Sequence, residues 1–131
     1  MSKPADLGSV KTGSYIVIDG EPCRIVDFDK SKPGKHGSAK ARVVGVGIFD
    51  NIKRSIVSPV SSGIEIPLIE KRSAQIISLT PTKIQIMDLE NYEISDIDIP
   101  EDEEIKNKLA AGKEVEFWRV LGKQKVVRVK G

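Results

Sequence analysis

The chain has very few of the residues that build disulfides and Cys/His metal sites. Its 131 residues include one cysteine, Cys23, and one histidine, His36. A single cysteine forms no disulfide within the chain, which favours a reducing compartment. One cysteine and one histidine are also too few for a Cys/His zinc site. We therefore expect a protein with no metal and no bound cofactor.

Aromatic residues and long apolar segments are also scarce. Phe, Trp and Tyr make up 5% of the chain, so the core must be built from Ile, Val and Leu. No segment approaches the ~18 apolar residues of a membrane-spanning helix, and the N-terminus lacks the apolar region of a signal peptide. We expect a cytoplasmic protein that does not bind membranes.

Charge is abundant but nearly balanced, with a formal net charge of +2. Its distribution is uneven. Residues 30–42 include five basic residues and no acidic one, whereas residues 96–104 include six acidic residues and no basic one. A local basic cluster on a nearly neutral chain indicates a focused contact with a polyanion.

In the first half of the chain, short segments rich in Ile, Val and aromatic residues alternate with polar residues. This pattern predicts strands at residues 15–18, 23–28, 42–48, 55–57 and 63–66, separated by turn residues. Five short strands without a helix predict a small antiparallel barrel. Cys23 is predicted to lie in its core. Gly45 and Gly47 form a lone GxG inside a strand, which indicates a bulge or close packing.

In the second half, three predicted strands (75–79, 83–87 and 92–94) precede a helix at 100–111 and strands at 115–120 and 125–129. Pro100 at the start of the helix and Gly112 after its end support the helix. Three strands, a helix and two strands are the outline of an OB-fold. We predict an all-β protein whose domains meet within residues 67–72, giving residues 1–69 and 70–131.

Phe117 and Trp118 are neighbours on a predicted strand, so they face opposite sides of the sheet. We predict that Trp118 packs in the core. An exposed aromatic residue here would instead stack on an RNA base, and the pattern does not decide which of the two residues contacts RNA.

The segment from Asp29 to Arg42 reads DKSKPGKHGSAKAR and connects two predicted strands. It is longer than an ordinary hairpin loop, and long loops are enriched in function. Glycines on both sides of Lys35-His36 allow another molecule to approach Lys35 closely. A phosphate-binding P-loop is excluded because Asp29 occupies the place of its first glycine and His36 that of its Ser or Thr.

Residues 32–40, KPGKHGSAK, resemble the modification loop of translation factor 5A, a family of archaea and eukaryotes related to bacterial elongation factor P. The resemblance covers nearly the whole chain, since the family combines an SH3-like barrel with an OB-fold. It implies that Lys35 is converted to hypusine by transfer of an aminobutyl group from spermidine, through deoxyhypusine synthase, and then hydroxylation. The other residues of the loop are Lys32, Pro33, Gly34, His36, Gly37 and Ser38. Pro33 and Ser38 depart from the eukaryotic loop, which indicates an archaeal-type member and leaves hydroxylation open.

The resemblance also implies a role that is not enzymatic. The factor would bind the large ribosomal subunit next to peptidyl-tRNA and promote peptide-bond formation at stalling sequences such as consecutive prolines. Its modified lysine would position the tRNA, while the ribosome performs the chemistry. We expect a monomer whose RNA-contacting residues are Lys30, Lys32, Lys40 and Arg42.

Two alternatives stay open. The chain would be an unmodified RNA-binding protein or RNA chaperone if its OB-fold did the work. It would be an enzyme if Lys35 were an amine nucleophile, but such a lysine is normally desolvated, and a glycine-flanked loop tip is wet. His36 lacks a nearby carboxylate that would orient it as a general base. The resemblance gives His36 a role in loop shape or in recognition by the modifying enzyme, and a simply solvated histidine fits equally well.

Overall fold

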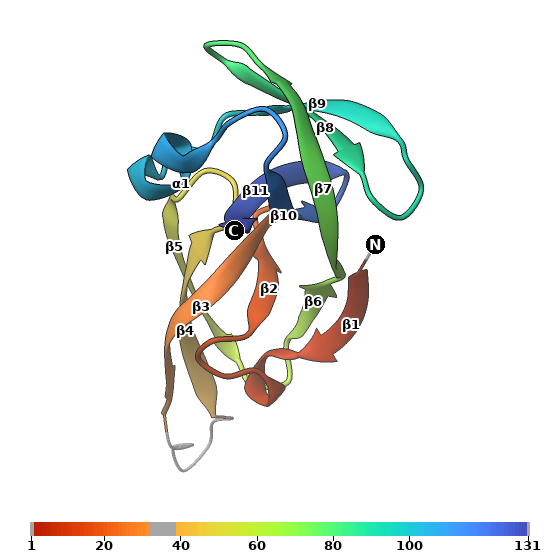
Figure 1. Ribbon diagram of the computed structural model, residues 1–131. Helices are drawn as coiled ribbons and strands as arrows, with labels where there is room; N and C mark the ends of the chain where they lie inside the picture. Colours follow the sequence, from red (N-terminus) through yellow and green to blue (C-terminus); the bar gives the residue numbers. More distant parts are fainter. Residues whose placement is uncertain (1, 32–38, 131) are drawn as a thin grey trace. The chain divides into compact units, whose positions relative to one another are not determined.

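A computed structural model of the chain describes residues 2–31 and 39–130 (Figure 1). The chain divides into two compact units, Met1–Leu68 and Ile69–Gly131, called unit 1 and unit 2 below. Strands dominate both units, so the predicted all-β class is confirmed. Nowhere in the described ranges is a helix long and apolar enough to cross a membrane.

Unit 1 is an SH3-like barrel made of two antiparallel sheets. The larger sheet has the order β2-β3-β4-β5, and β1 pairs with β6. The strands are β1 (Ser2–Asp6), β2 (Tyr15–Ile18), β3 (Glu21–Lys30), β4 (Lys40–Gly47), β5 (Lys53–Pro59) and β6 (Gly63–Pro67), with a 3-10 turn, η1 (Leu7–Ser9), after β1. All five strands predicted in this half are present. The sequence pattern missed β1, because its residues SKPAD lack apolar alternation and four of the five are exposed.

The core of unit 1 consists of aliphatic side chains and one thiol. Leu7, Ile16, Ile25 and Val43 are fully buried, and Cys23 lies among them as predicted. The close packing predicted for the two glycines of β4 is also confirmed. A Cβ atom added at Gly45 would lie 2.9 Å from Cys23 Cβ, and one added at Gly47 would lie 2.0 Å from Asp50 Oδ1. Glycine at these two positions therefore allows neighbouring side chains to pack directly against the backbone of β4.

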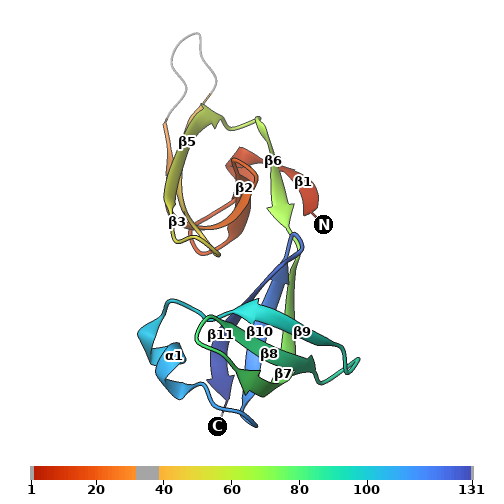
Figure 2. The same cartoon turned by 90° about the horizontal axis from the view of Figure 1, so that it is seen from above.

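Unit 2 has the strand order of an OB-fold (Figure 2). Its five-stranded sheet runs β11-β10-β7-β8-β9, and α1 follows β9 and lies beside β11. The elements are β7 (Ile69–Leu79), β8 (Lys83–Asp88), β9 (Ile94–Asp98), α1 (Glu103–Lys108), β10 (Glu114–Val120) and β11 (Lys123–Lys130). The predicted order of three strands, a helix and two strands is confirmed. The core is again aliphatic, with Phe117 as its largest fully buried side chain.

The predicted helix at 100–111 was too long at both ends. Asp102 is the N-cap, and its carboxylate accepts hydrogen bonds from the N–H groups of Glu104 (2.9 Å) and Ile105 (3.3 Å). Pro100 therefore precedes the helix. At the other end Leu109 is extended and packs against the core of unit 2. The helix therefore begins at the Asp102 cap and ends before the partly buried Leu109.

Two strands of unit 2 were misplaced from the sequence. β7 begins at Ile69, inside the segment expected to be a linker, and its first four residues pair with β10. β9 spans Ile94–Asp98 rather than residues 92–94, and Tyr92 belongs to the preceding turn with φ 60°. In both places charged residues interrupt the apolar alternation, so the pattern understates the pairing.

Candidate functional site

The loop predicted to carry the function connects β3 and β4. The two strands pair as far as Lys30 and Ala41. Beyond that pair the Ser31 N–H donates to the Lys40 carbonyl oxygen at 2.8 Å, and the Lys40 N–H donates to Ser31 Oγ at 3.2 Å. The paired stem is thus longer than the sequence indicated, since residues 29–42 were expected to be loop. The predicted loop residues lie outside the described residues: Lys32, Pro33, Gly34, Lys35, His36, Gly37 and Ser38.

The stem of this hairpin is anchored in the core of unit 1. Ala41 and Val43 of β4 are fully buried, and Phe28 of β3, opposite Val43, packs against the same core. A register shift between Ile25 and Asp27 adds one residue to β3. Such a bulge bends and twists its strand. The two ends of the loop, Ser31 and residue 39, are therefore set by a paired and partly buried stem.

The basic residues of the stem lie on two different faces. Lys40 and Arg42 alternate with the buried Ala41 and Val43, so both point to the outer face of the sheet. Lys30 pairs with Ala41 and lies on the other face, where its Nζ is 5.8 Å from the centre of the Phe28 ring. The structure brings together Lys40 and Arg42 but not Lys30. The predicted single patch is therefore two separate groups.

Trp118 does not pack in the core of unit 2, so that prediction was wrong. Phe117, 1% exposed, occupies the core, and Trp118 is half-buried on the opposite face of β10. The indole N–H of Trp118 donates to Glu116 Oε2 at 3.2 Å, and Lys71 Nζ lies 5.2 Å from the centre of the ring system. Sequence alternation separates the two aromatics but does not say which face is buried.

Strand register surrounds Trp118 with positive charge. Trp118 lies between Lys71 of β7 and Lys125 of β11. One row along, Arg128 forms an ion pair with Glu116 at 2.8 Å. Partial burial raises the pKa of Glu116, whereas the hydrogen bonds from Trp118 and Arg128 lower it. The lowering effects together are larger, so the pKa of Glu116 lies below its ordinary value. This group, called the Trp118 strip, combines an aromatic ring with flanking cations, as surfaces that bind single-stranded nucleic acid do.

A buried ion pair fixes the turn between β8 and β9 to β7. The Arg72 Nε–H donates to Asp88 Oδ2, and Asp88 is 3% exposed. The other carboxylate oxygen, Oδ1, accepts the N–H groups of Glu90 (2.8 Å) and Asn91 (3.3 Å). The hydrogen bond from Arg72 holds the pKa of Asp88 below its ordinary value. These contacts satisfy Asp88 completely and give it a structural role.

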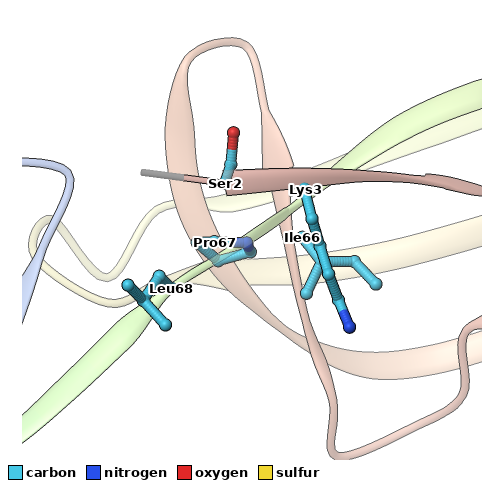
Figure 3. Close-up of a pocket in the computed structure, with 5 residues that line it drawn as sticks. All are labelled: Ser2, Lys3, Ile66, Pro67 and Leu68. Carbon is cyan, nitrogen blue, oxygen red and sulfur yellow. The ribbon is translucent and has the colours of Figure 1, made fainter.

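A cavity of about 280 Å³ in unit 1 lies beside the paired strands β1 and β6. Its lining residues are Ser2, Lys3, Ile66, Pro67 and Leu68 (Figure 3). The hydroxyl of Ser2 and the amine of Lys3 point in opposite directions, so these polar groups do not converge on one point. Across the ranges 2–31 and 39–130, no three His, Cys, Asp or Glu side chains are grouped to hold a metal ion.

Comparisons with known proteins agree over both units. The family model described as "Translation initiation factor 5A-like, N-terminal" matches residues 1–62. A second model, "Eukaryotic elongation factor 5A hypusine, DNA-binding OB fold", matches residues 68–130.

Curated relatives and solved structures cover nearly the whole chain. Translation initiation factor 5A of Thermofilum pendens is 51% identical over 129 residues, 98% of each chain, and that of Metallosphaera sedula is 53% identical over 124 residues, 95% of each. The solved structure of eukaryotic translation initiation factor 5A from Methanococcus jannaschii has a TM-score of 0.89 at 47% identity, covering 98% of this chain and 95% of that one. A family protein from Naegleria fowleri has a TM-score of 0.80 at 31% identity, over 99% of both chains. The chain belongs to the translation initiation factor 5A family, a family of translation factors.

Proposed function

We propose that the chain binds the ribosome next to peptidyl-tRNA and promotes peptide-bond formation at stalling sequences such as consecutive prolines. Its working group would be a hypusine or deoxyhypusine side chain at Lys35. The observation that carries this proposal is the β3–β4 hairpin, whose stem is paired up to Ser31 and Lys40. The sequence between those ends resembles the family's modification loop, and the description of the family model that matches residues 68–130 includes the word hypusine.

The proposed modification requires little of the protein except an accessible primary amine. Deoxyhypusine synthase would form a new C–N bond between Lys35 Nζ and the aminobutyl group of spermidine. The C–N bond that holds this group in spermidine breaks, and 1,3-diaminopropane leaves with the bonding electrons and with the proton that Lys35 Nζ loses. The product is a longer side chain with a second cationic amine. Two cationic donors on one slender arm suit a cleft lined by RNA phosphates. The factor would then act by positioning the tRNA rather than by chemistry of its own.

Two described surfaces support contact with ribosomal RNA and tRNA. Lys40 and Arg42 lie together on the outer face of the hairpin stem and follow the proposed working lysine closely in the sequence. The Trp118 strip of unit 2 offers a ring for stacking and cations for phosphates. Both surfaces fit recognition of shape and backbone rather than of base sequence. We place this activity in the cytoplasm and expect the chain to act as a monomer.

The Trp118 strip also favours a second candidate function. A protein that binds RNA through its OB-fold, with Lys35 unmodified, would need an aromatic ring and cations on unit 2. The intact mass of protein purified from its native host separates the two functions. The first requires added aminobutyl mass at Lys35, and active protein of unmodified mass would favour the second.

Substitution of Lys35 tests the first function directly. Lys35→Arg keeps the positive charge but removes the primary amine that accepts the aminobutyl group. We expect the variant to stimulate peptide-bond formation at consecutive prolines at least about tenfold less than the parent protein, because misplacing a substrate can lower the reaction rate by that factor. The measurement is dipeptide and tripeptide formation in a reconstituted translation system. Lys32→Arg, in the same loop, is the matched control, and full activity of Lys35→Arg would contradict the proposal.

A further inference from the structure

Charge is separated within unit 2. Residues 84–105 contain nine acidic residues and no basic one; they include most of β8, all of β9 and the start of α1. β11 shows the reverse, with four basic residues and no acidic one in KQKVVRVK. Phosphate-binding groups are thus concentrated away from β8 and β9.

The outer face of β8 and β9 is poorly suited to RNA. The strand pairing puts Lys83 opposite Asp98, Gln85 opposite Asp96, and Met87 opposite Ile94. Lys83 is the one basic residue of these two strands, and its Nζ is paired with Asp98 Oδ1. In OB-folds the second and third strands, here β8 and β9, usually form the oligonucleotide-binding face. On this face the phosphates of a bound RNA would lie next to carboxylates, which repel them.

The same part of the unit exposes large apolar side chains. Tyr92 is 69% exposed and Ile94 is 58% exposed. Tyr92 also has φ 60°, a conformation that bulky residues rarely adopt. Its N–H donates to the Asp88 carbonyl oxygen at 2.8 Å, and the Asp88 N–H donates to the Glu93 carbonyl oxygen at 2.8 Å. These contacts fix the backbone that presents the Tyr92 ring to solvent.

We propose that this face docks a basic protein segment on the ribosome. The face, called the Tyr92 face, consists of Met87, Ile94, Asp96 and Asp98, which share one face of β8 and β9, together with the exposed Tyr92 just before β9. Exposed tyrosine and aliphatic side chains supply the apolar centre of a protein interface, and tyrosine is enriched at its strongest contacts. The carboxylates select a partner rich in Lys or Arg that also carries an apolar side chain. Charge thus favours a protein over RNA.

The occupant is placed on the ribosome because the family acts in translation. The proposal requires that the chain binds ribosomes, as the proposed function does, but not that Lys35 is modified. A second copy of the chain, with its basic β11, is a different occupant that the experiment separates.

Site-specific photo-crosslinking on purified ribosomes tests the proposal. Tyr92→p-benzoylphenylalanine in the full chain replaces one exposed ring by a reactive one, and sedimentation with ribosomes establishes binding first. We expect the crosslinked product to be a ribosomal protein peptide with an excess of Lys and Arg. A crosslink to RNA or to a second copy of the chain, or ribosome binding without a crosslink at this position, overturns the proposal.

Charge reversal makes the test specific. Adding Asp96→Lys and Asp98→Lys to the crosslinking chain should lower the yield at least about fivefold, because both exposed carboxylates of this face are replaced by cations that repel a basic segment. Thr12→p-benzoylphenylalanine, at an exposed position of unit 1, should not give the same product. An unchanged yield after charge reversal overturns the proposal.

Adding Lys35→Arg instead should leave the crosslink in place. If the chain with Lys35 present and modified binds ribosomes and crosslinks but does not promote peptide-bond formation, the proposed function alone is refuted. A chain that does not bind ribosomes refutes both.

Discussion

At the residue scale, Gly45 occupies a position where a side chain does not fit. A Cβ atom there would lie 2.9 Å from Cys23 Cβ and 3.1 Å from Ile18 Cδ1, both inside the core of unit 1. We predict that Gly45→Ala destabilises the protein by about 1–3 kcal/mol, the usual effect of overpacking. Urea unfolding measures this difference. Gly63→Ala is the control, because no atom lies within 4 Å of its added Cβ, and a similar loss there would contradict the packing explanation.

Asp88 gives the stability of unit 2 a defined dependence on pH. Its folded pKa lies below its ordinary value of 3.8 because Arg72 donates to its carboxylate. A lowered folded pKa stabilises the protein above the unfolded pKa, and this stabilisation is lost as the pH falls through the folded pKa. The stabilisation by Asp88 is therefore lost over a pH range that begins near pH 4 and extends below it.

We predict that Asp88→Asn lowers the free energy of unfolding at pH 7 by about 1–3 kcal/mol. Its stability should also fall less steeply than that of the parent protein below pH 4, because the titrating carboxylate is gone. Denaturant unfolding between pH 7 and 2.5 measures both effects. Asp98→Asn removes an exposed carboxylate paired with Lys83 and should change the curve little. Parallel curves for Asp88→Asn and the parent would refute the assignment.

At the scale of elements, the β3–β4 hairpin carries Lys40 and Arg42 on one face and Lys30 on the other. We predict that neutralising Lys40 and Arg42 together, as Lys40→Gln and Arg42→Gln, makes the log–log salt slope of ribosome binding shallower by roughly 1 to 2. Lys30→Gln should change the slope less, because Lys30 lies on the other face beside Phe28. Titrations at several KCl concentrations provide the slopes. If Lys30→Gln changes the slope as much as the double variant does per substitution, strand face does not determine the contact.

The elements that sequence predicted well are those whose apolar alternation is uninterrupted. In β2 and β8, isoleucines recur at every second position, and the predicted strands match the observed ones within one residue. β1, the start of β7 and β9 carry charges or proline within the pattern, so their pairing depends on partners distant in sequence. The helix α1 is shorter than predicted because the chain turns extended at Leu109, whose partly buried side chain packs against the core of unit 2.

The candidate site was predictable in part for the same reason. The modification loop is a local motif, so it can be recognised from the sequence alone. The separation of Lys30 from Lys40 and Arg42 depends on the register across β3 and β4 and on the bulge after Ile25. The outward position of Trp118 depends on which face of β10 meets the core. Neither property is encoded in local spacing.

At the scale of the whole molecule, the chain has two separate hydrophobic cores. One core, which includes Ile16, lies within unit 1, and the other, which includes Ile86, lies within unit 2. Units of this size bury a modest fraction of their surface, so each depends strongly on its own core.

We predict that Ile86→Ala destabilises unit 2 by about 2–4 kcal/mol, from lost burial and the cavity left behind. Hydrogen exchange followed by peptide mass spectrometry should show faster exchange in β7, β8 and β10 and little change in β3 and β4. Ile16→Ala is the reciprocal control, with its effect in unit 1. Equal acceleration in both units would show that the chain unfolds as one cooperative body.

The burial of Cys23 makes the chain its own reporter of this behaviour. It is the single thiol of the protein, it is 0% exposed in the core of unit 1, and burial raises its pKa. A thiol that is both shielded and protonated reacts slowly with alkylating reagents. Iodoacetamide added to the folded chain would therefore mark molecules in which unit 1 has opened, and one mass increment would count them without any engineered label.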